Sequence, residues 1–253
     1  MPVPTTGTSP WVRRGALAAL VVVLVVAGTL WWRRPERSVV LVGDSIAQET
    51  TPYLRDALGG TRLIEKYFGG TAPCDWLDND LRATSHRVVA LSFTGNSFTP
   101  CMADGQGGFL HGQALLDRYR LDLTTLVDGV ASTGAAVLLV GQPARGPAAA
   151  DGTDAAMEVA GINAIYKDLA DADPADEVTF VDAGAQVETP DGAFAESLPC
   201  RPGEAECGPG GQNPVRNADG VHLCVSSGED PCQGYSSGAF RFAAGIAKAV
   251  QEL

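Results

Sequence analysis

The chain has 253 residues, of which 45% are hydrophobic and 19% charged, and its formal net charge is −12. This length and composition are typical of one globular domain with a sizeable core, or of two small domains. The first 37 residues hold five of the 18 basic side chains and one of the 30 acidic ones, so the rest is strongly acidic. Such a body argues against a nucleic-acid-binding protein, because phosphate binding requires a basic face.

After a short tail at residues 1–14, an uncharged stretch of 18 residues runs from Gly15 to Trp32. As a helix it would span roughly 27 Å, close to the hydrocarbon thickness of a bilayer. Tryptophans at its end and arginine pairs on both sides favour a transmembrane anchor at 15–32, followed by a basic linker at 33–37. A cleaved signal peptide is the alternative, but the stretch is long for one and no A-x-A-like cleavage site follows it.

The arginines on both sides of this stretch give conflicting indications of its orientation. The cysteines favour one answer, because all six follow the anchor and an even number is typical of an oxidising compartment: Cys74, Cys101, Cys200, Cys207, Cys224 and Cys232. No CxxC pair or Cys/His cluster has the spacing of a metal site. We therefore expect a single-pass membrane protein whose body, residues 38–253, is extracytoplasmic and binds no metal.

Beyond residue 37, strand-like and helix-like runs alternate. The predicted strands are Ser38–Val42, Arg62–Tyr67, Arg87–Phe93, Ala135–Val140 and Glu177–Val181. The predicted helices are Ala47–Leu58, Asp75–Arg82, Gly112–Ala131, Asp154–Ala170 and Ser237–Leu253. This alternation predicts a three-layer α/β/α domain with a mainly parallel five-stranded sheet.

Two stretches depart from this alternation. Gly141–Gly152 is rich in Pro, Ala and Gly, which predicts a loop. Asp182–Asp219 is much longer and contains two cysteines. It is expected to be either an ordered, cross-linked loop that shapes a substrate cleft or a solvated insertion.

The most informative motif is Gly43-Asp44-Ser45, which directly follows the first apolar strand. A β-branched run that ends in glycine predicts a buried strand stopping at a tight turn, so Ser45 would lie where ligands bind in open α/β sheets. If the next helix starts close behind, free backbone N–H groups surround Ser45 and favour a developing negative charge. The alternative is that Asp44 and Ser45 simply cap this helix.

Three further motifs occupy equivalent positions. Asp219 precedes His222 by three residues, a spacing at which the carboxylate reaches the ring and orients it toward a nucleophile. Asn96 follows the third strand, where its amide is able to donate to an oxyanion. Gly69 and Gly70 follow the second strand and allow close backbone approach to a ligand. Each motif has a structural alternative as a turn, but in a parallel sheet the strand ends share one edge, so all of them are expected to come together there.

The remaining histidines, His86 and His111, are expected to have surface or loop positions. The chain contains no G-x-S-x-G elbow, which disfavours a lipase-type α/β-hydrolase. It also contains no P-loop or dinucleotide fingerprint, so no cofactor is expected.

The order Gly-Asp-Ser, Gly, Asn and Asp-x-x-His resembles the SGNH hydrolase family, also called the GDSL esterases, over most of residues 38–253. The resemblance implies a flavodoxin-like fold and a serine esterase with Ser45 as nucleophile, His222 as base and Asp219 orienting the base. It also implies an oxyanion hole formed by the Ser45 and Gly70 amides and the Asn96 side chain, with Gly69 replacing Gly70 if the register shifts by one.

The sequence departs from the family pattern at two positions. Ile46 stands where the first block usually has Leu, and Ser97 stands where many members have Asp after the asparagine. Similar Gly-Asn-Ser forms occur in extracytoplasmic members linked to sugar O-acetylation. The resemblance thus implies an acetyl or short-chain acyl ester of an envelope carbohydrate or lipid as substrate. The alternatives are an O-acyltransferase that works with a membrane acyltransferase partner, and a non-catalytic envelope binding module.

If the loops of this resemblance converge, a Cys74–Cys101 bridge would hold both oxyanion donors in place. Cys224 follows the base closely and is expected to pair with Cys232, which leaves Cys200 for Cys207. General stabilisation of an exported domain, about 2–5 kcal/mol for each bridge, is the alternative role of these disulfides.

Overall fold

The structure is a computed structural model that describes residues 38–78, 81, 88–147, 149, 152–175, 177–225 and 232–253. The tail at 1–14, the anchor at 15–32, the linker at 33–37 and His86 lie outside this part. Within the described residues, no helix has the length and apolar character needed to cross a membrane.

A parallel sheet of five strands, in the order β2-β1-β3-β4-β5, forms the middle layer. In chain order the strands are β1 (Ser38–Gly43), β2 (Arg62–Tyr67), β3 (Val88–Ser92), β4 (Ala136–Val140) and β5 (Val178–Val181). In the register of β1 with its two neighbours, Val40 lies opposite both Ile64 of β2 and Val89 of β3. This strand order is flavodoxin-like, so the expected fold class is confirmed.

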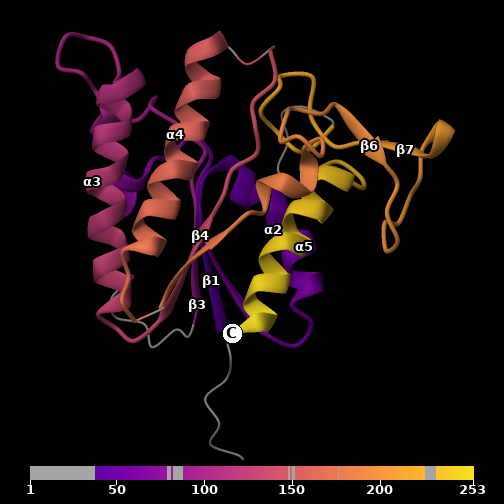
Figure 1. Ribbon diagram of the computed structural model, residues 1–253, viewed down its shortest axis with the longest axis horizontal. Helices are drawn as coiled ribbons and strands as arrows, with labels where there is room; N and C mark the ends of the chain where they lie inside the picture. The colour runs from indigo at the N-terminus through magenta and orange to yellow at the C-terminus, as the bar shows by residue number, and fades with distance from the viewer. Residues whose placement is uncertain are drawn as a thin grey trace, which may run out of the picture. The chain divides into compact units, whose positions relative to one another are not determined.

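Helices cover both faces of the sheet (Figure 1). The helices are α2 (Ser45–Ala57) and α5 (Ser237–Glu252) on one face, and α3 (Gly112–Ala131) and α4 (Gly152–Asp171) on the other. Along β1, Val39 and Leu41 pack toward α2 and α5, whereas Val40 and Val42 pack toward α3 and α4. Because β1 is buried on both faces, it is a continuous apolar run rather than an alternating one.

The predicted helix Asp75–Arg82 is wrong in its described part, which forms only the short 3-10 helix η1 (Pro73–Trp76). Asp75 accepts hydrogen bonds from the Ala72 amide at 2.9 Å and from the Thr99 hydroxyl at 2.6 Å. Cys74 is bonded to Cys101 in η2 (Pro100–Met102). The contacts with Thr99 and Cys101 are long-range, and they hold this segment beside η2 in place of the helical continuation that the local pattern favoured.

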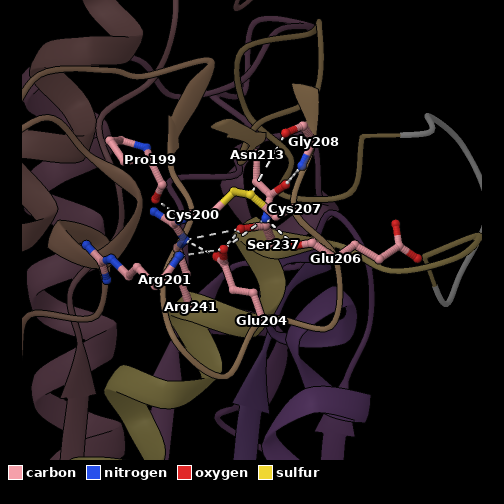
Figure 2. The surroundings of a disulfide bond; sticks show 10 residues. All are labelled: Pro199, Cys200, Arg201, Glu204, Glu206, Cys207, Gly208, Asn213, Ser237 and Arg241. Carbon is pink, nitrogen blue, oxygen red and sulfur yellow. Dashed lines mark hydrogen bonds and ion pairs between the residues drawn. A yellow bond between two sulfur atoms is a disulfide. The ribbon is translucent and has the colours of Figure 1, made fainter. Parts of the chain in front are cut away.

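The long segment at 182–219 is ordered and cross-linked, which was one of the two expectations for it. It contains η3 (Gly184–Val187), η4 (Pro209–Gly211) and a small antiparallel pair, β6 (Ser197–Pro199) with β7 (Gln212–Pro214). Figure 2 shows the Cys200–Cys207 disulfide beside an ion pair between Glu204 and Arg241 of α5. In this pair, Arg241 Nε lies 2.6 Å from Glu204 Oε1. The ion pair joins this segment to the last helix.

Candidate active site

Ser45 is the first residue of α2, directly after the turn that ends β1. The turn needs glycine at position 43, because a Cβ there would lie 2.2 Å from the Ser92 carbonyl oxygen. Asp44 caps the helix by accepting the Ile46 amide at 3.1 Å. The capping interpretation is therefore confirmed for Asp44, and Ser45 stands at the helix N-terminus, the position that the nucleophile interpretation requires.

A hydrogen-bonded series joins Ser45 to the loop before α5. His222 Nε2 lies 3.0 Å from Ser45 Oγ, and His222 Nδ1 lies 2.7 Å from Asp219 Oδ2. Because a carboxylate only accepts hydrogen bonds, Nδ1 carries the proton and Nε2 is free to accept the one on Ser45. The side chains of His222 and Asp219 are 34% and 41% exposed, so a substrate has access to them.

Asp219 is held in its ionised form by its neighbours. Its Oδ1 atom accepts the amides of Val221 at 2.7 Å and of His222 at 3.0 Å. Burial opposes the charge, but the hydrogen bonds from the His222 ring and from these amides outweigh it and lower the pKa of Asp219. The tight turn requires Gly220, whose φ is +76° and where a Cβ would lie 3.0 Å from the Gly146 Cα.

Asn96 is fixed from two sides. Its Nδ2 donates to Asp44 Oδ2 at 2.9 Å, and its carbonyl oxygen accepts the Tyr119 hydroxyl at 2.9 Å. The same Asp44 oxygen accepts the Thr94 amide at 2.6 Å and the Thr94 hydroxyl at 2.7 Å. Burial raises the pKa of Asp44, and the bonds from Thr94 and Ile46 oppose that rise. Asp44 thus both caps α2 and orients the Asn96 amide.

The two glycines after β2 lie in a turn in which the Thr71 amide donates to the Phe68 carbonyl oxygen at 3.3 Å. Gly70 has φ +81°. A Cβ on Gly69 would be 3.9 Å from Ser45 Cβ, whereas one on Gly70 would meet nothing within 4 Å. Gly69 is therefore the residue that faces the serine, although the sequence pattern placed Gly70 first.

The three disulfides in the structure are the expected pairs: Cys74–Cys101, Cys200–Cys207 and Cys224–Cys232. The first joins the loop after the Gly69-Gly70 turn to the loop after Asn96. The last closes the segment that directly follows the base. Two of the three bridges therefore brace loops that carry the candidate site.

The sequence patterns missed two groups that hold the base loop, one on α2 and one within the loop itself. Glu49 Oε2 accepts the amides of Leu223 at 2.7 Å and Cys224 at 3.2 Å. Asn217 Nδ2 donates to the Cys224 carbonyl oxygen at 2.7 Å. The one available signal was the position of Glu49, a single helical turn after Ser45 on the same helix. His111 lies apart from these groups, exposed at the N-terminus of α3 as expected.

Comparison with solved structures supports the same fold. The chain is similar to a GDSL-like lipase from Bacteroides thetaiotaomicron (18% identity, 86% of this chain and 89% of that one, TM-score 0.56). It is also similar to the C-terminal catalytic domain of a Streptococcus pneumoniae peptidoglycan O-acetyltransferase (18%, 85% and 93%, TM-score 0.52). A third neighbour is an acetyl xylan esterase (17%, 84% and 99%, TM-score 0.55).

No protein-family model and no curated protein matches the chain. The structural similarities therefore establish the fold, which is the α/β architecture of the SGNH hydrolases; a shared fold does not by itself fix the chemistry.

Proposed function

We propose that this protein is an SGNH-type serine esterase that hydrolyses acyl esters through Ser45, His222 and Asp219. The observation that carries the proposal is the continuous series from Ser45 Oγ to His222 Nε2 and from His222 Nδ1 to Asp219 Oδ2, at 3.0 and 2.7 Å. Nucleophile, base and orienting carboxylate at hydrogen-bond distance are what covalent acyl transfer requires. A chain that only bound envelope material would not need this series.

In the first half-reaction, Ser45 Oγ attacks the ester carbonyl carbon while His222 Nε2 accepts the hydroxyl proton. The resulting imidazolium is stabilised by Asp219 and then protonates the leaving alcohol. In the second half-reaction, His222 takes a proton from water, which attacks the acyl-enzyme and releases the acid. Ser45 recovers its proton from His222, so the protein ends unchanged.

The oxyanion is expected to lie near the start of α2, where we expect three donors to converge. The Ser45 amide belongs to the first helical turn, and within the described residues neither Gly69 nor Gly70 has a partner for its amide. The Asn96 side chain has a second N–H besides the one bonded to Asp44, and its acceptor in the structure is the Thr71 carbonyl oxygen at a long 3.4 Å from Nδ2. These groups are preorganised for the negative charge that forms on the carbonyl oxygen.

Replacement of Asn96 by alanine is expected to lower kcat for acetyl ester hydrolysis by about 10²–10³-fold, with KM little changed. The donor acts on charge that develops in the transition state, which is why kcat and not KM responds. Steady-state kinetics on a chromogenic acetyl ester measure the effect. A wild-type kcat in this variant would remove Asn96 from the oxyanion hole.

The proposed substrate is an acetyl or short-chain ester on an envelope carbohydrate or lipid, met outside the cytoplasm. Three disulfides in one domain support an oxidising compartment. The anchor expected at 15–32 would keep the enzyme at the membrane surface. Among its structural neighbours, one is named for acetyl xylan and another for peptidoglycan O-acetylation, which supports a sugar ester.

Acyl transfer to a glycan hydroxyl is the second candidate, favoured by the likeness to the O-acetyltransferase domain. It differs only in the group that attacks the acyl-enzyme, and it would need a membrane partner to supply acyl groups. Incubation with a labelled acetyl ester, with and without an added glycan, separates the two. We expect free acetate in both samples. Acetate that appears only as glycan ester would favour the transferase.

A further inference from the structure

Glu49 stands one helical turn after the nucleophile on α2 and contacts the loop that carries the base. Its Oε2 atom accepts two backbone amides, those of Leu223 at 2.7 Å and Cys224 at 3.2 Å. These are the two residues that immediately follow His222. The helix α2 therefore carries both Ser45 and the carboxylate that binds the loop containing His222.

We propose that Glu49 is a positioning residue that sets the distance between His222 and Ser45 and, through its negative charge, favours the protonated imidazole during catalysis. The inference rests on the proposed esterase function and extends it to a residue outside the triad. The positioning role follows from geometry, because the anchoring amides are adjacent in sequence to the base and Ser45 is on the same helix as the carboxylate.

Three charged or titratable groups face Glu49 from the base loop and the segment before it. His222 attracts its charge, Asp219 repels it, and the buried Arg216 interacts favourably with it. Burial raises the pKa of Glu49, which His222 and the two amides oppose. Burial likewise lowers the pKa of Arg216 to about 10, so this side chain stays charged at neutral pH.

A raised pKa means that Glu49 gains its proton at a higher pH than an exposed glutamate does. Over the pH range in which Glu49 gains its proton, the protein loses the charge that holds the two amides and attracts the imidazolium. While it is present, the charge on Glu49 thus helps to set the position of the acid limb of the pH profile, because it favours the protonated form of the base.

The experiment compares Glu49→Ala, Glu49→Gln and the control Asp56→Asn. Asp56 is an exposed carboxylate near the other end of α2, so its replacement removes the same charge away from the site. Circular dichroism checks the fold of each variant. The base loop keeps its ties to Asn217 and to the Cys224–Cys232 bridge in all three.

We expect Glu49→Ala to lower kcat by about 10-fold to 100-fold with KM unchanged, because two hydrogen bonds to a charged group are lost from the base loop. Glu49→Gln keeps an acceptor oxygen and is expected to recover much of that loss. Its acid limb should nevertheless move to lower pH, since the charge that favours the imidazolium is gone. Asp56→Asn should match the wild type both in kcat and in the acid limb of the pH profile.

A wild-type kcat in Glu49→Ala would overturn the proposal. So would a Glu49→Gln variant whose pH profile is unchanged, because a purely structural contact would not move it. NMR titration of the His222 ring, identified by its loss in His222→Ala, gives a readout that needs no activity. If the wild type cleaves no ester, the proposed function fails, and an unchanged ring titration in Glu49→Gln would separately contradict the role of Glu49.

Discussion

Replacement of Ser45 by alanine is expected to lower kcat/KM for acetyl ester hydrolysis by about 10⁴-fold or more, with no loss of folded structure. The hydroxyl is the only group in the proposed pathway that forms the covalent bond. Its removal leaves the cap at Asp44 and the start of α2 intact, because neither uses the Ser45 side chain. Initial rates on a chromogenic ester measure the loss of activity, and thermal melting measures whether the variant stays folded.

The triad should also behave as a unit. We expect His222→Ala alone to lose nearly as much activity as Ser45→Ala, and the double variant to lose no more than either. Ser132→Ala is the matched control, since this serine is exposed at the far end of α3, away from the site. Additive losses in the double variant, or an active Ser45→Ala, would show that hydrolysis proceeds elsewhere.

The largest expected effect on stability comes from Arg241, which is 2% exposed. Its Nε donates to Glu204 Oε1 at 2.6 Å and to Ser237 Oγ at 3.1 Å, and its Nη2 donates to the Pro199 carbonyl oxygen at 2.7 Å (Figure 2). Arg241→Leu would leave the Glu204 carboxylate buried without its partner. We expect the free energy of unfolding to fall by about 3–5 kcal/mol, measured by urea denaturation with disulfides intact.

The matched control for Arg241 is Lys248→Gln on the same helix. Lys248 forms an exposed ion pair with Glu252, the two atoms being 3.8 Å apart, and its loss should cost at most ~0.5 kcal/mol. Adding Glu204→Gln to Arg241→Leu should recover part of the stability by removing the unpaired charge. If Arg241→Leu and Lys248→Gln lowered the free energy of unfolding equally, a special role for the buried pair would be contradicted.

The ion pair of Glu204 with Arg241 makes the protein less stable as the pH falls. Burial opposes ionisation of Glu204, but hydrogen bonds from Arg241 and Ser237 outweigh it and lower its pKa to about 2. A lowered folded-state pKa means that this contribution, ~3 kcal/mol, is fully present above about pH 4.5. It is lost as the pH falls toward 2, a decline that Arg241→Leu should largely remove.

The fold was predictable because its evidence is local. Each β-branched run became a strand close to its expected bounds, and the motifs at the strand ends fell at one edge because all five strands are parallel. The Asp75–Arg82 helix failed for the opposite reason. There the outcome depends on Thr99 and Cys101, partners that the local pattern does not contain.

The site shows the same difference between residues found from local motifs and residues placed by long-range contacts. Ser45, Asn96, Asp219 and His222 were identified from motif order, and the structure brings them close together. Glu49 was missed because its contact with Leu223 crosses 174 residues of sequence. Tyr119 was missed likewise, since only the packing of α3 places its hydroxyl on the Asn96 carbonyl oxygen.

Treatment with a fluorophosphonate, followed by mass spectrometry of the digested protein, tests the central claim most directly. An activated serine attacks this probe, whereas an ordinary helix-capping serine does not. We predict one adduct per chain, on Ser45, and none after His222→Ala. No adduct on the wild-type protein, or an adduct on a different serine, would contradict the assignment of Ser45 as the nucleophile.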